Sequence, residues 1–252
     1  MKRDRIFEIE SLINKRGKLS LKQLQESFPN VSQMTIRRDL LALEKDGKLI
    51  RVRGGAMSVQ DVQKASNVPY TKKTATHTDE KIEIAQKTAQ LIDADVSFFL
   101  DAGTTALYLA KEMPDLRYSV FTNGLAVATE LAKKKNVSIN LLGGALIKEN
   151  LSTVSSLASV FFADANFEVA VLSAAAFTVE HGFSCSSQME ADLCRLICQK
   201  AKAVYMMLDS SKIGKIKPYT FARLDDINVL ITDSAFPDSL KAQLKEQNIV
   251  LL

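Results

Sequence analysis

The feature that most constrains the fold is a helical pattern followed by a basic hairpin near the start of the chain. Residues 32–40 read SQMTIRRDL, with apolar positions on one helical face and basic positions on another. Residues 51–56 read RVRGGA, which is typical of a basic hairpin tip. A helix and a hairpin in this order predict a recognition helix and a wing, the two parts that a winged helix-turn-helix places against DNA.

The segment 1–57 predicts three helices and a hairpin. Apolar residues recur at helical spacing through residues 2–16, and Gly17 ends that run. Ser20 and Ser32 are expected to cap the second and third helices, because a serine hydroxyl accepts a hydrogen bond from the first helical turn. The inward face of the third helix is expected to hold Ile36, Leu40 and Leu43.

Charge is distributed unevenly along the chain. Residues 1–57 carry 13 Lys and Arg against 7 Asp and Glu, whereas the remainder carries 20 against 22. A small basic segment joined to a nearly neutral one is typical of a nucleic-acid module attached to a second domain. An ordinary solvated basic surface remains the alternative interpretation.

The third helix and the hairpin supply side chains suited to double-stranded DNA. Hydroxyl groups and helix N-terminal N–H groups hold phosphates, and Arg and Gln form paired hydrogen bonds with base edges. The predicted DNA-binding residues are Ser32, Gln33, Thr35, Arg37, Arg38, Arg51 and Arg53. A winged helix that contacts protein instead, with its arginines paired to Asp39 and Glu44, stays open.

The run VSQMTIRRDLLALEKDGKLIRVRGGA, from Val31 to Ala56, resembles the N-terminal signature of the DeoR family of bacterial transcriptional regulators. One departure is Arg53, which stands where the family most often has His before the two glycines. This change keeps or raises the positive charge, so the resemblance still implies DNA binding.

The rest of the chain is expected to contain a linker over residues 58–78 and an α/β domain over residues 79–252. The linker is polar and then rich in Thr and Lys. Short apolar strands alternate with helices from Asp79 onward, which favours a mostly parallel sheet covered on both sides. The expected strands are 96–100, 118–122, 137–142, 169–173, 203–208, 229–232 and 249–252. The expected helices are 79–92, 105–113, 125–135, 189–200 and 238–246.

Polar residues follow several of these strands. The first strand ends in DAGTT (residues 101–105), and other strands end in TNG (122–124), GG (143–144) and DSSK (209–212). Ligands of parallel sheets bind beyond the carboxyl ends of the strands, and a glycine before a helix N-terminus suits an anion. The four segments together predict a phosphate-binding site.

Residues 79–233 also resemble the DeoR family's C-terminal sensor domain, which is related in fold to ribose-phosphate isomerase and CoA-transferase-like proteins. The resemblance implies a phosphorylated sugar as effector. The implied phosphate contacts are Asp101, Gly103, Thr104 and Thr105. The implied contacts to the rest of the ligand are Thr122, Asn123, Gly143, Lys148, Glu190, Asp209 and Lys212. The chain departs from the family at Ser155, Ser173 and Ala176, where Gly is usual, and at Cys194, where Lys is usual.

Residues of the larger domain leave other functions open. His181, Cys185, Cys194 and Cys198 lie within 18 residues and contain zinc-ligand chemistry, but they lack a tight pair of cysteines, and Cys194 and Cys198 sit among apolar residues. The residues Asp101, Glu190, Asp209 and Lys212 could perform acid–base chemistry in a sugar-phosphate isomerase-like enzyme. A DNA-binding protein without a small-molecule effector is the third alternative.

The combined prediction is a transcriptional regulator, a repressor of sugar or related catabolic genes, that is not an enzyme. We expect a homo-oligomer, either a dimer or a tetramer, without metal or other cofactor. No apolar run approaches the about 18–20 residues of a membrane helix, and no apolar stretch follows the basic N-terminus as in a signal peptide. The expected location is therefore the cytoplasm.

Overall fold

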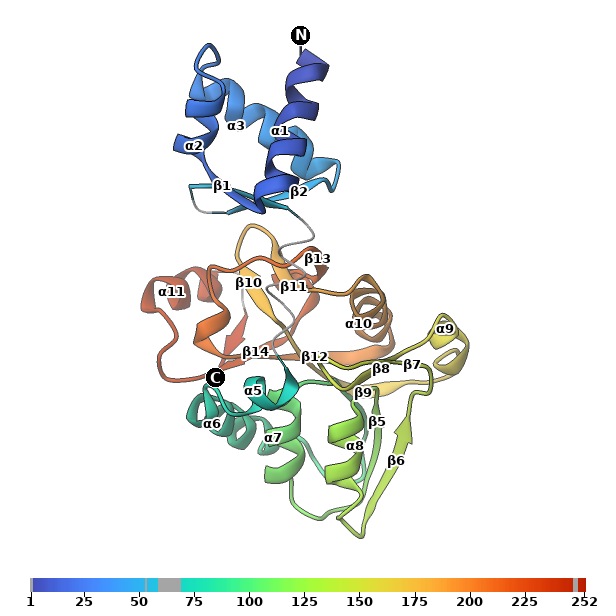
Figure 1. Cartoon of the computed structure of the whole chain (residues 1–252). Helices are drawn as coiled ribbons and strands as arrows, with labels where there is room; N and C mark the ends of the chain where they lie inside the picture. Colours follow the sequence, from blue (N-terminus) through green and yellow to red (C-terminus); the bar gives the residue numbers. More distant parts are fainter. Residues whose placement is uncertain (1, 53, 59–68, 247–248) are drawn as a thin grey trace. The chain divides into compact units, whose positions relative to one another are not determined.

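The computed structural model describes residues 2–52, 54–58, 69–246 and 249–252. The chain divides into a small N-terminal unit and a larger unit, which are described separately (Figure 1). Arg53 and residues 59–68 of the predicted linker lie outside the described residues. Within the described ranges, no helix has the length and apolar character needed to span a bilayer.

The N-terminal unit is a winged helix-turn-helix, as predicted. Its helices are α1 (Lys2–Arg16), α2 (Leu21–Ser27) and α3 (Gln33–Lys45). Its strands are β1 (Lys18–Ser20), β2 (Leu49–Val52) and β3 (Gly55–Ser58), which form an antiparallel sheet in the order β1-β3-β2. Both predicted caps are present, because the Ser20 hydroxyl accepts from the Gln23 N–H and the Ser32 hydroxyl accepts from the Thr35 N–H, each at 3.2 Å.

The core of this unit comes from one face of each helix. The inward positions of α3 pack against those of α1 and α2, and the cluster includes Ile9, Ile13, Leu24, Ile36, Leu40 and Leu43. Gly55 is required where β3 meets β1, since a Cβ there would lie 2.1 Å from the Leu19 carbonyl oxygen. The wing strand β3 is therefore held directly against β1.

The end of the predicted linker is helical. Residues Tyr70–Thr74 form the short helix α5, and His77 adopts a left-handed conformation (φ 53°) at the start of α6 (Thr78–Ala89). The prediction of a linker was wrong for this part, because polar Thr and Lys residues can form a helix when tertiary contacts hold it. Here Tyr108 donates to the Thr74 carbonyl oxygen, and Lys81 donates to the carbonyl oxygens of Lys73 and Thr76.

The larger unit is built on a seven-stranded parallel sheet in the order β15-β14-β12-β9-β4-β5-β6. Its strands are β4 (Ser97–Leu100), β5 (Tyr118–Thr122), β6 (Val137–Leu141), β9 (Phe167–Ser173), β12 (Ala201–Leu208), β14 (Val229–Thr232) and β15 (Val250–Leu251). The main helices besides α6 are α7 (Thr104–Glu112), α8 (Leu125–Leu131), α10 (Gln188–Lys200) and α11 (Asp238–Glu246). This confirms the predicted α/β fold class.

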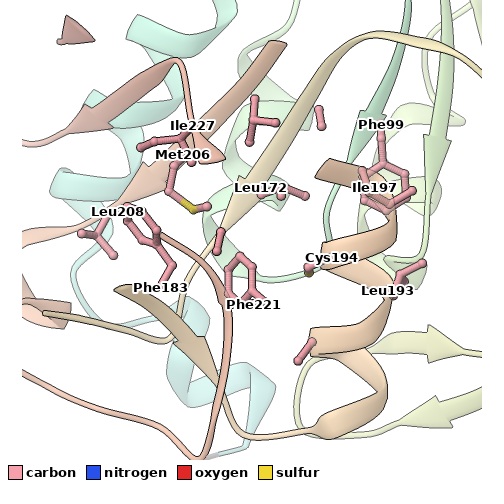
Figure 2. Packing of buried hydrophobic residues seen from close by; sticks show 14 of the residues in the cluster. Phe99, Leu172, Phe183, Leu193, Cys194, Ile197, Met206, Leu208, Phe221 and Ile227 are labelled. Carbon is pink, nitrogen blue, oxygen red and sulfur yellow. The ribbon is translucent and has the colours of Figure 1, made fainter. Parts of the chain in front are cut away.

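Both faces of the sheet are buried, as a parallel sheet requires. In β4, Phe98 and Leu100 pack in the cluster that includes α6, α7 and α8, whereas Phe99 packs in the cluster on the other face. Figure 2 shows part of this second cluster, in which Leu172 and Met206 of the sheet face residues of α10 such as Cys194.

Three features of the larger unit were not predicted from the sequence. They are a β7–β8 hairpin (Ala145–Ile147 and Ser152–Val154), a four-residue helix α9 (Ala158–Phe161) and a small antiparallel sheet of β10 (Ala176–Thr178), β11 (Gly182–Cys185) and β13 (Tyr219–Ala222). The small sheet covers part of the hydrophobic core through Phe177 and Phe183, whose stacked rings have their centroids 4.5 Å apart.

The strand order reverses between β4 and β9. From β4 the chain adds β5 and β6 on one side, then returns to place β9 on the other side of β4 and continues outward through β12 and β14. In open parallel sheets this reversal is where ligands bind, beyond the carboxyl ends of the strands. Asp101 follows β4 and Ser173 ends β9, so both lie at that point.

Candidate functional site

The outer face of α3 carries polar side chains that the fold leaves exposed. Gln33, Arg37 and Arg38 are exposed, while Thr35 is half-buried and its hydroxyl lies 2.9 Å from the Ser32 hydroxyl. Among the described residues, no ion pair or hydrogen bond involves the guanidinium group of Arg37 or Arg38. These two cations are therefore available to a partner.

The two acidic residues of α3 have other partners. Asp39 is buried and accepts from Arg5 Nε at 2.6 Å, so it does not pair with Arg37 or Arg38. Glu44 accepts from the Arg51 Nε at 2.7 Å and from the Arg51 backbone N–H at 3.0 Å. Among the predicted DNA-binding arginines that the structure describes, the alternative pairing therefore holds for Arg51 and not for Arg37 or Arg38.

Where the strand order of the large sheet reverses, Asp101 connects the ends of β4 and β9 through hydrogen bonds. Its Oδ1 accepts from the Ala102 N–H at 2.8 Å, and its Oδ2 accepts from the Ser173 N–H at 3.2 Å and the Ser173 hydroxyl at 3.1 Å. Burial, reinforced by the Glu190 carboxylate, raises the pKa of Asp101 to about 7. The hydrogen bonds from Ser173 and Ala102 oppose that rise but do not cancel it.

The residues after Asp101 form an open helix start. Gly103 has φ +117°, a conformation that favours glycine, and no side chain caps α7. Thr104 is half-buried and Thr105 is buried. Uncapped N–H groups at a nine-residue helix with hydroxyl groups beside them form an arrangement that suits an anion.

The neighbouring strand β5 supports this loop. The Asn123 Oδ1 accepts from the Ala102 N–H at 3.1 Å, and the Asn123 carbonyl oxygen accepts from the Thr153 N–H at 2.7 Å. Thr122 is fully buried, and its hydroxyl accepts from the Gly124 N–H at 3.0 Å. Thr122 is thus part of the framework of the site.

Glu190 is held at the start of α10 by the β7–β8 hairpin. Its Oε1 accepts from Asn150 Nδ2 at 2.8 Å and from the Ser152 hydroxyl at 2.6 Å. Glu190 is buried, and its charge contributes to the raised pKa of Asp101. Two predicted residues that are 89 positions apart in the sequence therefore interact in the fold.

Three lysines gather at the same edge. Lys212 Nζ lies 3.6 Å from the Asp209 Oδ2. Lys73 Nζ donates to the Glu149 carbonyl oxygen at 3.0 Å and to Asn150 Oδ1 at 2.8 Å. Burial lowers the pKa of both Lys73 and Lys81, and the Lys212 ammonium group lowers each of them further.

Sequence reasoning missed Lys73, Lys81, Asn150 and Ser152. A usable signal existed for Lys81 alone, because it shares the buried face of α6 with Ile84, Ala85 and Thr88. A lysine on an apolar helical face needs polar partners in the fold. The other three residues are polar positions without any local pattern.

Two of the predicted ligand residues lie at exposed positions, unlike the buried Asp101 and Glu190. Gly143 is exposed, and Lys148 is exposed in the turn between β7 and β8.

The four departures from the family lie in different surroundings. Ala176 and Cys194 lie in the core. The Ser155 hydroxyl accepts a hydrogen bond from the Leu157 N–H. The Ser173 hydroxyl lies close to Gly103, at 3.4 Å from the position that a Cβ on this glycine would take.

The proposed zinc ligands have other neighbours. The Cys185 thiol donates to the Ser187 carbonyl oxygen, Cys194 is buried in the core, and His181 Nδ1 lies 3.2 Å from the Thr178 hydroxyl. Burial raises the pKa of Cys185 and Cys198 to about 12. Within the described ranges, no three His, Cys, Asp or Glu side chains are grouped to hold a metal ion.

Comparison with known families matches both units. Residues 5–62 match the DeoR-like helix-turn-helix domain, and residues 76–234 match the DeoR C-terminal sensor domain. The two matches together account for most of the chain, in the order that the fold shows.

Individual relatives match along nearly the whole length. The HTH-type transcriptional regulator YulB of Bacillus subtilis, itself described as uncharacterized, is 36% identical over 95% of this chain and 92% of its own. The lactose phosphotransferase system repressor of Streptococcus mutans is 33% identical over 99% of each chain. Among solved structures, ribose 5-phosphate isomerase A of Methanocaldococcus jannaschii is 12% identical, with a TM-score of 0.41 over 55% of each chain.

Proposed function

Because the chain belongs to the DeoR family of transcriptional regulators, we propose that it is a repressor whose affinity for its DNA operator is controlled by a phosphorylated sugar. The DNA would contact the outer face of α3, and the sugar phosphate would bind at the carboxyl edge of the large sheet. Repression is proposed because three relatives, including the lactose phosphotransferase system repressor, are named as repressors.

The observation that carries the effector proposal is the charge arrangement at the sheet edge. Lys73, Lys81 and Lys212 interact electrostatically there, and the uncapped N-terminus of α7 follows Gly103 at the same edge. Cations and free N–H groups favour a phosphate. The carboxylates of Glu190 and Asp209 can accept hydrogen bonds from sugar hydroxyl groups.

The proposed control acts through differential binding. A ligand shifts DNA affinity only if it binds the DNA-bound and free forms of the protein with different affinities. The sheet edge contains internal bonds that a ligand would compete for, such as those from Lys73 to the β7–β8 hairpin. Lys73 belongs to α5, which is the first described helix after the N-terminal unit in the sequence.

The test is a thermal-shift panel of sugar phosphates and their unphosphorylated parents, followed by operator binding with and without each hit. A ligand at a hundredfold excess over its dissociation constant stabilises the folded state by about 2.7 kcal/mol, which a melt detects readily. We expect phosphorylated sugars to raise the melting temperature and to change operator affinity, while the parent sugars do neither.

Matched variants test whether the sugar phosphate binds at the carboxyl edge of the sheet. Thr104→Val removes one hydroxyl at nearly constant shape, and Lys212→Ala removes one cation, so both should weaken the response without weakening operator binding. Thr129→Val is the control, because its hydroxyl donates to the Leu125 carbonyl oxygen on α8. If no sugar phosphate shifts either the melt or the operator affinity, the effector proposal fails while the DNA proposal stands.

An enzymatic alternative has one specific observation in its favour, the buried Asp101 whose pKa of about 7 suits proton transfer. Incubating a stabilising sugar phosphate with the protein and following it by NMR separates the two functions. A sensor leaves the compound unchanged, whereas an isomerase converts it.

A further inference from the structure

One ion pair of the N-terminal unit links the first helix to the predicted recognition helix. The Arg5 Nε of α1 donates to the Asp39 Oδ2 of α3 at 2.6 Å. The Asp39 side chain is 1% exposed, whereas 22% of the Arg5 side chain is exposed. Among the described residues, Asp39 Oδ1 has no hydrogen-bond partner, so Arg5 alone compensates the buried carboxylate.

Stability by itself does not account for this pair. Taking charges out of water costs free energy, and a buried ion pair is often no more stabilising than apolar side chains of similar volume. The pair does fix the position of its members, because the carboxylate is buried within the unit and holds the planar guanidinium group that it binds. Asp39 therefore keeps Arg5 beside α3.

The Arg5 guanidinium group retains donors for a further partner. Its Nε is occupied by Asp39, while its two terminal nitrogens make no hydrogen bond or ion pair with the described residues. On α3, Asp39 lies one helical turn after Thr35, so these two residues share a side of the helix. Arg5 thus flanks the side of α3 that carries a predicted DNA-binding residue.

The charges in the first turn of α1 oppose the helix dipole. Residues 2–5 read KRDR, so cations outnumber anions there. The N-terminus of a helix carries partial positive charge, which makes cations unfavourable and an anion favourable. The last turn of α1 holds Lys15 and Arg16, where cations are favourable. The start of α1 therefore favours an anionic partner, independently of the ion pair.

We propose that Arg5 binds a phosphate of the DNA backbone, and that Asp39 is the positioning residue that holds it there. A guanidinium group pairs with phosphate through parallel N–H donors, which the terminal nitrogens supply. A side chain that is already fixed loses less conformational entropy on binding than a free one. The inference rests on the DNA-binding part of the proposed function, and it adds a contact from α1 to those predicted for α3 and the wing.

The experiment measures the affinity of the full chain for a mixed-sequence DNA duplex as a function of salt concentration, because phosphate contacts do not depend on sequence. Arg5→Gln keeps an N–H donor for Asp39 but removes the cation. The slope of log affinity against log salt should decrease in magnitude by about 0.9, the value of one phosphate contact, and affinity at about 0.1 M salt should fall roughly eightfold.

The double variant Arg5→Gln with Asp39→Asn separates phosphate binding from structural support. It removes both charges of the pair, so its net charge equals that of the wild type and no unpaired carboxylate stays buried. If Arg5 only neutralises Asp39, this variant should bind with the wild-type slope. We expect it to keep the reduced slope of Arg5→Gln, while its melting temperature returns toward the wild-type value. If Arg5→Gln does not fold, the double variant supplies the slope.

The matched control is Arg16→Gln, which removes the same charge at the other end of α1, where the side chain is exposed. It should leave the slope unchanged. A wild-type slope in either Arg5 variant, or an equal decrease in Arg16→Gln, would overturn the proposal. A wild type that binds no DNA would instead refute the DNA-binding function on which the proposal rests.

Discussion

The outer face of α3 and the carboxyl edge of the large sheet use their polar groups in opposite ways. On α3, Arg37 and Arg38 are exposed and make no ion pair within the described chain. At the sheet edge, Asp101, Glu190 and Lys81 are buried and already hold hydrogen bonds within the protein. A partner can bind the first surface without disturbing the fold, whereas a ligand at the second must exchange internal bonds for its own.

Under the proposed function, this difference matches DNA recognition to the first region and effector sensing to the second. A surface of free side chains binds through added contacts, and its residues can change with little effect on stability. A network of buried groups couples ligand binding to the positions of the elements that hold it. In this chain those elements are α5, the β7–β8 hairpin and the start of α10.

The largest expected effect on stability comes from a substitution on the inner face of α3. Ile36 is fully buried, whereas Met34 on the same helix is 73% exposed. Ile36→Ala should lower the free energy of unfolding by about 2–5 kcal/mol, because it leaves a cavity in a small core. Met34→Ala is the matched control and should change that free energy by less than about 0.5 kcal/mol. Urea unfolding of the full chain measures both, and equal losses would contradict the assigned faces.

The second effect tests the buried network at the sheet edge. The pKa of Asp101 is raised to about 7, so between about pH 4 and pH 7 the folded state retains a proton that the unfolded state has released. The contribution of Asp101 to the free energy of unfolding is therefore greatest below about pH 4 and falls as the pH rises to about 7.

Asp101→Asn removes this titration. The free energy of unfolding of the variant relative to wild type should rise by on the order of 3 kcal/mol between those pH values. Hydrogen bonds from the backbone of Asn136 and Lys135 lower the pKa of the exposed Asp115, so its contribution is lost only as the pH falls below about 4. Asp115→Asn is thus the control, and a pH-independent difference for Asp101→Asn would contradict the assignment.

The same contrast governs what the sequence could predict. The proposed DNA-binding role of α3 follows from nine consecutive residues, because cap, inner face and outer face are all local properties. Asp101, Asn123 and Asp209 were predictable as the ends of parallel strands.

The remaining polar residues of the site depend on distant contacts. Lys73 meets Asn150 across 77 positions, and Asn150 meets Glu190 across 40. No local pattern marks Lys73 or Asn150, and the Thr and Lys residues around Lys73 gave it the composition of a linker. The hairpin and α9 were missed for the same reason, since both are short elements held by the neighbouring sheet.

The third effect tests the outer face of α3. Arg37→Ala should leave the melting temperature unchanged and weaken operator binding by about 1–3 kcal/mol if the side chain reads a base. If it contacts a phosphate instead, the slope of log affinity against log salt should decrease in magnitude by about 1. Lys133→Ala, an exposed lysine of the larger unit, is the charge-matched control. Wild-type affinity and slope in the Arg37 variant would show that DNA uses another face.

The smallest effect separates a structural role from a binding role at the start of α3. Ser32 and Ser20 cap successive helices with the same hydrogen bond, 3.2 Å to the N–H three residues ahead. Ser32→Ala and Ser20→Ala should therefore cost similar stability, about 0.5–2 kcal/mol each. Only Ser32 is predicted to face DNA, so at equal stability Ser32→Ala should bind the operator more weakly than Ser20→Ala. Thermal melts and titrations with a labelled operator give both quantities. Equal operator affinity in the two variants would mean that Ser32 acts through the helix alone, and that the DNA-binding surface of α3 begins after its cap.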